Sequence, residues 1–387
     1  MTRYPAKDQV AIVGVGSTGF RRDSGRSSAA MAAEASIGAI RDAGLNRDDI
    51  DAVVVAAEPG APAPHQLASM LGLPTIVHHT RPTPVAAFAL IDAVNAVFAG
   101  TCDTALVCFS MMRTPGASRS STGDPLRRNL MMGAPSYPEN ASMAAAYAAW
   151  ASRYVYEYDT RREDFGYVAI NGRTNAARNP LAVMRSPLSM SDYLAARMIR
   201  EPLCLFDMDV PVDGADAFVV TTAERARELP HPPVLVHAAT AGLVGTNDED
   251  QLPSLRRHGQ HVVVDRLKAM SDIWIDDVDV YLPYDGFSII TLGWIENTGW
   301  CAPGHAGRFL EEHWDAEHNR VLIDGRIPIN PHGGSLSEGA TRGSGHLREA
   351  VVQLRGDAGD RQVPGARTAL VTPGGFFFNS QGVVLRT

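Results

Sequence analysis

Four side chains suited to acid–base chemistry lie in the second half of the chain. Tyr284 and Asp285 follow the short predicted strand of segment 276–287. Two histidines stand beside glycines, His332 just before a Gly-Gly pair and His346 just after a glycine. Ligands bind beyond the carboxyl ends of strands in open α/β sheets. Tyr284 is therefore predicted to act as an acid, a base or a donor to an oxyanion, unless it only packs in the core.

The other three residues have both catalytic and structural interpretations. Asp285 is predicted to orient a neighbour or to stabilise the fold rather than to act as a base. His332 is a candidate pocket residue. His346 stands at the start of a predicted helix, a position more typical of a surface histidine, and it reaches the site only if the preceding turn bends it inward.

An internal repeat predicts the frame that positions these residues. The acidic turn and strand at 276–282 are similar to 48–55, and residues 369–372 are similar to 105–108. The two pairs occur in the same order, which indicates two similar halves that meet at a Pro-rich stretch. We assign residues 1–229 to the first half, with a loop or lid insertion at about 111–200, and residues 230–387 to the second.

Hydrophobic periodicity predicts the elements of each half. Residues 85–99 are almost wholly apolar, which is typical of a buried helix. Strands that alternate with helices predict an α/β fold with a mainly parallel or mixed layered sheet. The predicted helices span 28–43, 67–71, 85–99, 141–158, 161–178, 262–270 and 345–354, and the predicted strands span 10–13, 52–56, 104–108, 217–221, 234–238 and 368–371.

The stretch 111–138 is rich in Gly, Ser, Pro, Arg and Met and has little periodicity. A loop of that length inside a compact domain is usually functional or disordered. Its arginines, Arg127 and Arg128 among them, suit a lid over a phosphorylated ligand. A solvated flexible loop is an equally good interpretation.

A Gly-x-Gly-x-x-Gly pattern at 14–19 requires that a dinucleotide site be considered. The residues after Gly19 form a basic loop, so no helix N-terminus would meet a pyrophosphate. The nearest suitable acid, Glu34, falls inside a helix rather than at the end of a second strand. We therefore interpret the glycines as a turn that leaves an edge of the sheet.

Composition and charge exclude several functional classes. The 387-residue chain has a net charge of −8, which gives no electrostatic reason to expect nucleic acid or an anionic membrane as partner. No apolar run approaches the ~20 residues of a membrane span, and no signal peptide is evident. Cysteines 102, 108, 204 and 301 are scattered, so neither a disulfide framework nor a metal site is expected. These features predict a cytoplasmic protein.

Eight blocks together resemble the thiolase superfamily, specifically the sterol-carrier-type thiolases, along nearly the whole chain. Their joint order carries the resemblance, because each block alone is weak. It implies an α/β fold of two duplicated halves in five α-β-α-β-α layers, assembled as a tight homodimer. The blocks are 10–19, 43–55, 93–107, 171–180, 211–220, 276–287, 330–334 and 369–375.

The catalytic residues of thiolases do not carry over. By this resemblance, Thr83 lies near the place of the nucleophilic cysteine, Ala340 replaces the catalytic histidine, and Thr372-Pro373 stands where the second cysteine belongs. Tyr284 takes the place of the Asn or His that helps hold the thioester oxygen. Without a thiolate, acyl transfer has no evident route.

A thiolase frame without sulfur still suits an enolate reaction. Retro-aldol cleavage of a β-hydroxyacyl-CoA passes through the same enolate as thiolysis, but it releases a ketone or aldehyde and needs no acyl-enzyme. The chain resembles the steroid side-chain aldolases of the superfamily, which use tyrosines and work with a small zinc-ribbon/OB-fold partner. Tyr284 matches their first tyrosine, whereas Ala340 occurs where we look for the second.

The resemblance implies that coenzyme A is part of the substrate and that no other cofactor is used. Gly374 and Gly375 are predicted to offer N–H groups to the thioester oxygen, or else to form only a strand-end turn. Phe376-Phe377-Phe378 is the one stretch that suggests a sterol pocket. Two alternatives to the lyase stay open: a non-catalytic scaffold or acyl-CoA-binding subunit of a hetero-complex, and a Cys-independent condensing enzyme.

Overall fold

A nine-stranded mixed sheet runs through both halves of the protein. The computed structural model describes residues 4–82, 85–112, 143–244, 254–375 and 380–387. The strands follow the order β3-β2-β4-β7-β1-β8-β14-β13-β9. They are β1 (Val10–Arg21), β2 (Ala52–Val55), β3 (His78–Thr80), β4 (Thr104–Met111), β7 (Asp213–Thr222), β8 (Val234–Gly242), β9 (Val280–Pro283), β13 (Thr368–Thr372) and β14 (Ser380–Arg386).

Each half contains four strands that follow one another in a corresponding order toward the join between the halves, and β3 is an additional edge strand of the first half. In the first half β2-β4-β7-β1 lie side by side, and in the second β9-β13-β14-β8 do so. The first pair of each set is parallel and the remaining pairs are antiparallel. The halves join where Ala11 and Ile12 of β1 pair with Leu235 and Val234 of β8. The predicted duplication is confirmed.

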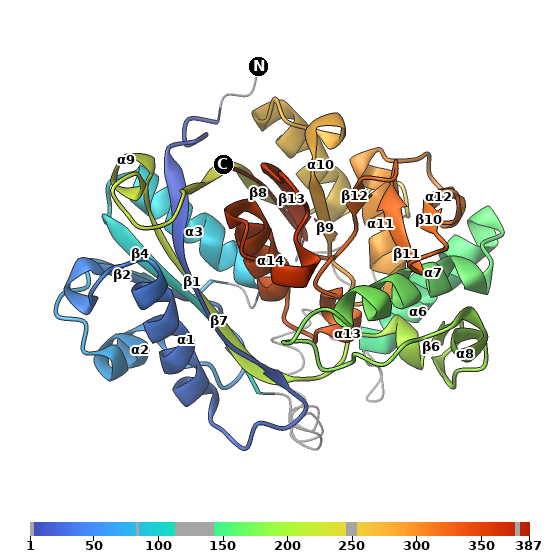
Figure 1. Ribbon diagram of the computed structural model, residues 1–387, viewed down its shortest axis with the longest axis horizontal. Helices are drawn as coiled ribbons and strands as arrows, with labels where there is room; N and C mark the ends of the chain where they lie inside the picture. Colours follow the sequence, from blue (N-terminus) through green and yellow to red (C-terminus); the bar gives the residue numbers. More distant parts are fainter. Residues whose placement is uncertain (1–3, 83–84, 113–142, 245–253, 376–379) are drawn as a thin grey trace.

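Helices divide the molecule into five layers (Figure 1). Helices α1 (Ser28–Asp42) and α2 (Pro64–Leu71) cover the outer face of the first half, and α10 (Gly259–Met270) and α11 (Ser288–Thr298) cover that of the second. Between the halves lie α3 (Ala86–Phe98) and α14 (Ser344–Arg355), which contact strands of both. Three separate apolar clusters fill the spaces between these layers, so the predicted α-β-α-β-α arrangement is confirmed.

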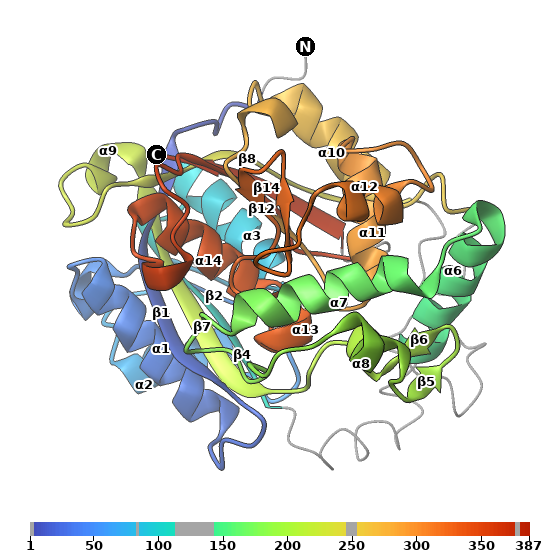
Figure 2. The ribbon, with the colours of Figure 1, turned by 45° about the vertical axis from the view of Figure 1, so that its right-hand side comes forward.

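A smaller group of elements extends the second half (Figure 2). Helix α7 (Arg162–Ala176) contacts α8 (Met190–Leu194), α11, α12 (Ala306–Glu312) and α13 (Gly334–Ser337). The remaining elements are α6 (Met143–Tyr158), α9 (Ala223–Ala226), the ribbon of β5 (Met198–Arg200) and β6 (Leu203–Cys204), and the small sheet of β10 (Trp314–Asp315), β11 (Arg320–Ile323) and β12 (Ile327–Pro328). Short 3₁₀ turns span Arg47–Asp49, Leu205–Asp207, Ile275–Asp277 and Gly359–Arg361.

The glycine pattern at 14–19 has a packing role, and the predicted turn there is wrong. All of these residues lie inside β1, which continues to Arg21. A Cβ built on Gly14 would lie 2.2 Å from the carbonyl oxygen of Ala39, and one on Gly16 would lie 2.1 Å from that of Ala35. Helix α1 therefore packs directly on the backbone of β1, and only glycine permits that approach.

No helix in the described ranges is long and apolar enough to cross a membrane.

From the contact between α1 and β1 we expect alanine substitutions at two glycines that face each other, Gly16 and Gly38, to have different effects on stability. Gly16→Ala inserts a methyl group 2.1 Å from a backbone oxygen, so we expect a loss of about 1–3 kcal/mol in the free energy of unfolding. Gly38→Ala, on α1, meets its nearest neighbour at 3.5 Å and favours the helix, so it is the matched control. Urea denaturation of both variants measures the difference, and equal stability of the two would contradict the packing argument.

Candidate active site

Tyr284 leaves the carboxyl end of β9 and is held beside β13. Its N–H donates to the carbonyl oxygen of Thr372 at 2.9 Å, and its side chain is 5% exposed. The phenol ring folds back over Gly286, where an added Cβ would lie 2.6 Å from a ring carbon. Gly286 is thus required for the ring position, which explains the sequence Tyr-Asp-Gly at the end of this strand.

Asp285 is buried and ties three segments together. Its carboxylate accepts the N–H groups of Ser335 at 2.7 Å and Leu336 at 3.2 Å, which caps the start of α13. A Cβ on Gly334 would lie 1.9 Å from the same carboxylate, so this glycine is needed for the approach. Asp285 also accepts a hydrogen bond from His346. These contacts suit an orienting or structural carboxylate, and the role of Asp285 in catalysis stays a prediction.

His346 points inward, so the expectation of a surface histidine is wrong. Its Nε2 donates to Asp285 Oδ1 at 3.1 Å, and its side chain has no solvent exposure. Helix α14 belongs to the middle layer, and both halves cover its first turn. The ring lies 5.8 Å from the Tyr284 ring between centroids. With Nε2 as the donor to Asp285, the neutral ring has its lone pair on Nδ1, which has no hydrogen-bond partner within the described ranges.

His332 lies against His346. The two rings meet edge to face with centroids 4.7 Å apart. His332 is fully buried, and neither of its ring nitrogens has a hydrogen-bond partner among the residues placed by the structure. Burial lowers the pKa of His332 well below its ordinary value, and the proximity of His346 adds to the effect. His332 is therefore a neutral imidazole at neutral pH, and its assignment as a pocket residue stays a prediction.

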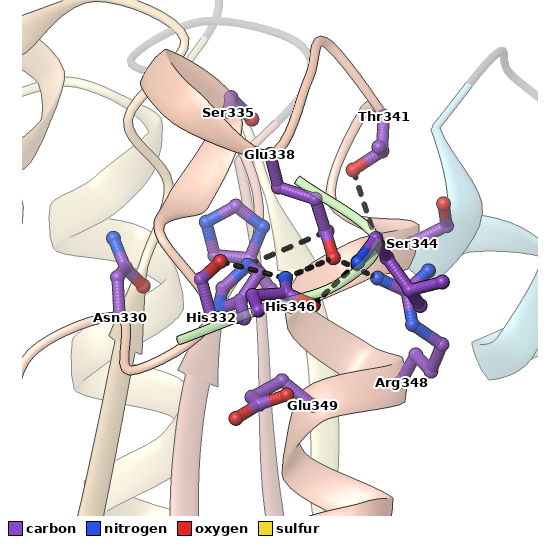
Figure 3. A network of polar contacts seen from close by, with 12 residues as sticks. Asn330, His332, Ser335, Glu338, Thr341, Ser344, His346, Arg348 and Glu349 are labelled. Carbon is purple, nitrogen blue, oxygen red and sulfur yellow. Dashed lines mark hydrogen bonds and ion pairs between the residues drawn. The ribbon is translucent and has the colours of Figure 1, made fainter. Parts of the chain in front are cut away.

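A buried polar network behind the histidines was not predicted (Figure 3). Glu338 accepts hydrogen bonds from Asn179 and Arg348. Arg348 also binds Asp216 at 2.5 Å, and Asp216 accepts from Ser344 at 2.6 Å. These residues come from the turn after α7, from β7, from α14 and from the chain after α13. No sequence motif connects such distant positions, although Arg348 lies in the predicted helix that carries His346 and Glu338 precedes that helix.

The glycines after β13 lie beside this cluster and are buried. The indole N–H of Trp294 donates to the Gly374 carbonyl at 2.5 Å, and the Ser380 hydroxyl donates to that of Gly375. The first bond fixes the peptide plane that also carries the Gly375 N–H, and with it the direction of one of the two N–H groups predicted to hold an oxyanion. Arg127, Arg128 and Phe376-Phe377-Phe378 lie outside the described residues.

The positions that carry catalytic groups in thiolases lack them here. Ala340 is fully buried and its N–H donates to the Val210 carbonyl at 2.8 Å, so its place provides only a methyl group. Thr372 ends β13 and is also buried. Thr83 lies outside the described residues, next to the start of α3. The described positions therefore contribute no sulfur and no imidazole.

The four cysteines are protonated thiols set in other parts of the fold. Cys108 lies in the outer core of the first half, Cys102 follows the far end of α3, and Cys204 and Cys301 belong to the outer core of the second half. Burial raises the pKa of Cys102, Cys108 and Cys301 to about 12 and that of Cys204 to about 11. None of them is activated as a nucleophile.

The arrangement is suited to proton transfer without covalent catalysis. Asp285 holds one nitrogen of His346 and leaves the other as a base, in the manner of a carboxylate–histidine pair. Tyr284 offers a hydroxyl group close to this base, and His332 adds a neutral imidazole. These groups can remove a proton from a hydroxyl and stabilise charge on a neighbouring oxygen.

Comparison with known proteins agrees with this chemistry. Over 97% of both chains the protein is 32% identical to the steroid side-chain-cleaving aldolase of Thermomonospora curvata. It is 33% identical to the 17-hydroxy-3-oxo-4-pregnene-20-carboxyl-CoA lyase of Mycobacterium tuberculosis, over 95% of this chain and 96% of that one. The chain belongs to the steroid side-chain-cleaving aldolases of the thiolase superfamily. Residues 248–387 also match the thiolase C-terminal domain-like family.

Solved structures support the same assignment. An Ltp2-ChsH2(DUF35) aldolase superposes with a TM-score of 0.85 and 30% identity, covering 99% of this chain and 98% of that one. A monomeric SCP2-thiolase-like protein from Mycobacterium smegmatis has a TM-score of 0.70 at 19% identity, which supports the fold alone. The protein is thus an aldolase, a carbon–carbon lyase built on a thiolase frame, as the resemblance in the sequence implied.

Because its thiols are protonated, we expect this aldolase to keep its activity in the presence of a cysteine-alkylating reagent. A thiol with a pKa of about 12 is ionised to only about 10⁻⁵ at pH 7, so iodoacetamide finds almost no thiolate. We expect activity within about two-fold of the untreated enzyme after labelling under native conditions. Mass spectrometry of the labelled protein provides the control, and inactivation that follows modification of a single cysteine would contradict a sulfur-free site.

Proposed function

We propose that the protein cleaves a bulky β-hydroxyacyl-CoA by a retro-aldol reaction and releases a ketone and a short acyl-CoA. The observation that supports this most is the buried Asp285–His346 pair, in which Nδ1 of His346 has no hydrogen-bond partner in the described part of the chain. A base of this kind is what a retro-aldol reaction requires at its first step. A thiolase reaction would need a thiolate instead, and all four cysteines have raised pKa values.

In the proposed mechanism His346 Nδ1 takes the proton of the β-hydroxyl group. The electron pair of that O–H bond forms the new carbonyl, and the bond between Cα and Cβ breaks. Its electrons move into the thioester and give the enolate of the short acyl-CoA. The resulting imidazolium is stabilised by Asp285, which accepts its other N–H. The enolate carbon then takes one proton, which completes the acyl-CoA product.

Tyr284 and the glycines after β13 are proposed to hold the negative charge of the enolate. The hydroxyl of Tyr284 donates to the thioester oxygen, and the N–H groups of Gly374 and Gly375 support it. Fixed donors aimed at a developing oxyanion contribute much of the rate enhancement in enzymes. The fixed carbonyl group of Gly374 limits how the N–H of Gly375 can move.

The substrate class comes from the two curated relatives. One is named for cleaving steroid side chains and the other for the compound 17-hydroxy-3-oxo-4-pregnene-20-carboxyl-CoA. We therefore propose a steroid-derived acyl-CoA with a hydroxyl group on its β-carbon. The phosphates of its coenzyme A are assigned to Arg127 and Arg128.

We also propose that the enzyme works as a homodimer with a small DUF35 partner of the zinc-ribbon/OB-fold type. The name of the similar Ltp2-ChsH2(DUF35) structure indicates such a partner for that aldolase. Strand β3 lies at the edge of the sheet and Val77 beside it is exposed, so this edge can pair with a second copy.

Removing one hydroxyl group tests the role of Tyr284. Tyr284→Phe keeps the ring over Gly286 but loses the oxyanion donor, so we expect kcat for the steroid substrate to fall about 10²–10³-fold. Tyr281→Phe is the matched control, because Tyr281 is equally buried on β9 but its hydroxyl bonds Thr298 at 2.7 Å. Release of ketone and short acyl-CoA is followed by mass spectrometry. Equal turnover of the two variants would remove Tyr284 from the mechanism.

The proposed partner is tested by co-expression. We expect a DUF35 protein encoded beside this chain to co-purify with it, and we expect the complex to cleave 17-hydroxy-3-oxo-4-pregnene-20-carboxyl-CoA. Size-exclusion chromatography with light scattering measures the number of copies in the complex. Tight binding of the acyl-CoA without any cleavage by the complex would favour a non-catalytic scaffold and contradict the proposed lyase.

A further inference from the structure

Several buried polar atoms gather beside His346 without hydrogen-bond partners among the residues that the structure describes. They are both ring nitrogens of His332, Nδ1 of His346 and Oε2 of Glu338. All three side chains are at most 1% exposed. Figure 3 shows them grouped at the start of α14. Buried polar groups are nearly always paired within a protein, so four such atoms at one place indicate a site that meets substrate or moves protons.

Glu338 uses its two carboxylate oxygens differently. Oε1 accepts from Asn179 Nδ2 at 2.8 Å and from an Nη of Arg348. Oε2 has no donor and faces Nε2 of His332 at 4.0 Å. A small rotation of the carboxyl group would bring these two atoms within hydrogen-bonding distance. The free oxygen is therefore directed at the imidazole and not at the ion pair.

Charge counting indicates that this carboxyl group keeps a proton. Arg348 is the one cation that binds both Glu338 and Asp216, so the buried trio would carry a net negative charge if both acids were ionised. The nearby Glu349 is already paired with Arg361 at 3.0 Å, and Asp285 accepts the N–H groups of His346, Ser335 and Leu336, so neither carboxylate depends on the charge of Arg348. Burial raises the pKa of Glu338 in spite of Arg348. One proton on Oε2 balances the charges.

In the proposed retro-aldol mechanism, the group that gives a proton to the enolate carbon is still to be assigned. The place where the aldolases of the family are expected to have a second tyrosine is occupied by Ala340, which carries no acid. Glu338 precedes it by two residues and lies behind His332. His332 in turn contacts His346, the base that holds the proton taken from the substrate.

We propose that His332, supplied by Glu338, is the acid that protonates the enolate carbon in place of the missing tyrosine. This inference rests on the proposed lyase function. Neutral His332 gives the proton on Nδ1 to the carbon, and its Nε2 takes the proton of Glu338 Oε2 in the same step. The imidazole stays neutral and Glu338 becomes a carboxylate held by Arg348 and Asn179. The proton on His346 then returns through His332 to Glu338, which restores the starting state.

Glu338→Gln separates this role from a structural one. The amide oxygen of glutamine can still accept from Asn179 and Arg348, whereas the side facing His332 can no longer release a proton. We expect kcat to fall about 10–100-fold while KM changes by less than about two-fold. Glu349→Gln is the matched control, because it makes the same change in a buried carboxylate on α14 whose partners are Arg361 and Gln353.

The pH profile gives a readout that a structural role would not change. The donor must be protonated, so wild-type kcat is expected to decline on the alkaline side, as pH rises through the raised pKa of Glu338. In Glu338→Gln this decline disappears, because glutamine does not titrate. Glu349→Gln should keep the wild-type profile.

A second variant keeps the test decisive if Glu338→Gln does not fold. His332→Gln leaves the bonds of Glu338 to Asn179 and Arg348 in place, and it should lower kcat to a similar extent. The double variant should be no slower than the slower single variant, because both residues serve one transfer. Single variants with wild-type kcat and pH profile would overturn the relay alone. A wild-type complex that cleaves no β-hydroxyacyl-CoA would overturn the proposed function and the relay together.

Discussion

One buried carboxylate connects the parts of the site. Asp285 leaves the end of β9, caps the first turn of α13 and binds His346 on α14. A buried carboxylate without partners would be strongly disfavoured, so these donors and Asp285 require one another. Two glycines make room for this arrangement: a side chain at Gly286 would displace the Tyr284 ring, and one at Gly334 would displace the carboxylate of Asp285. The position of the proposed base therefore follows from the way this one charge is satisfied.

The duplicated sheet brings these segments together. Each half contains two neighbouring parallel strands, whose carboxyl ends therefore lie side by side. In the second half these strands are β9 and β13. The middle layer places α14 between both sets of strands, so its first turn is enclosed even though its sequence carries His346, Arg348 and Glu349. This burial explains why these groups form hydrogen-bonded networks, and why the neighbouring His332 has an uncharged imidazole.

The frame of a thiolase is retained while its sulfur chemistry is absent. The thiols that remain have raised pKa values and are not activated, whereas the strand ends and glycine turns proposed to face an enolate are kept. An enolate needs fixed donors and proton transfer, and neither requires a covalent intermediate. A thiolase and an aldolase can therefore share one fold, with the difference confined to a few side chains at the strand ends.

The sequence by itself determined the duplicated α/β architecture, the buried α3 and the proximity of Tyr284 and Asp285, because these depend on local periodicity and on repeated patterns. It did not show β14, whose pairing with β8 and β13 is a long-range contact, and it misjudged the glycines of β1, whose neighbour is α1. His346 was expected at the surface because a helix start looks alike whether or not a second layer covers it. Glu338, Arg348, Asp216 and Asn179 were missed for the same reason: they come from four separate segments, and only the packing of both halves around α14 brings their charges together. The tertiary structure decided which polar groups lost their water, and that loss is what makes them an acid–base site.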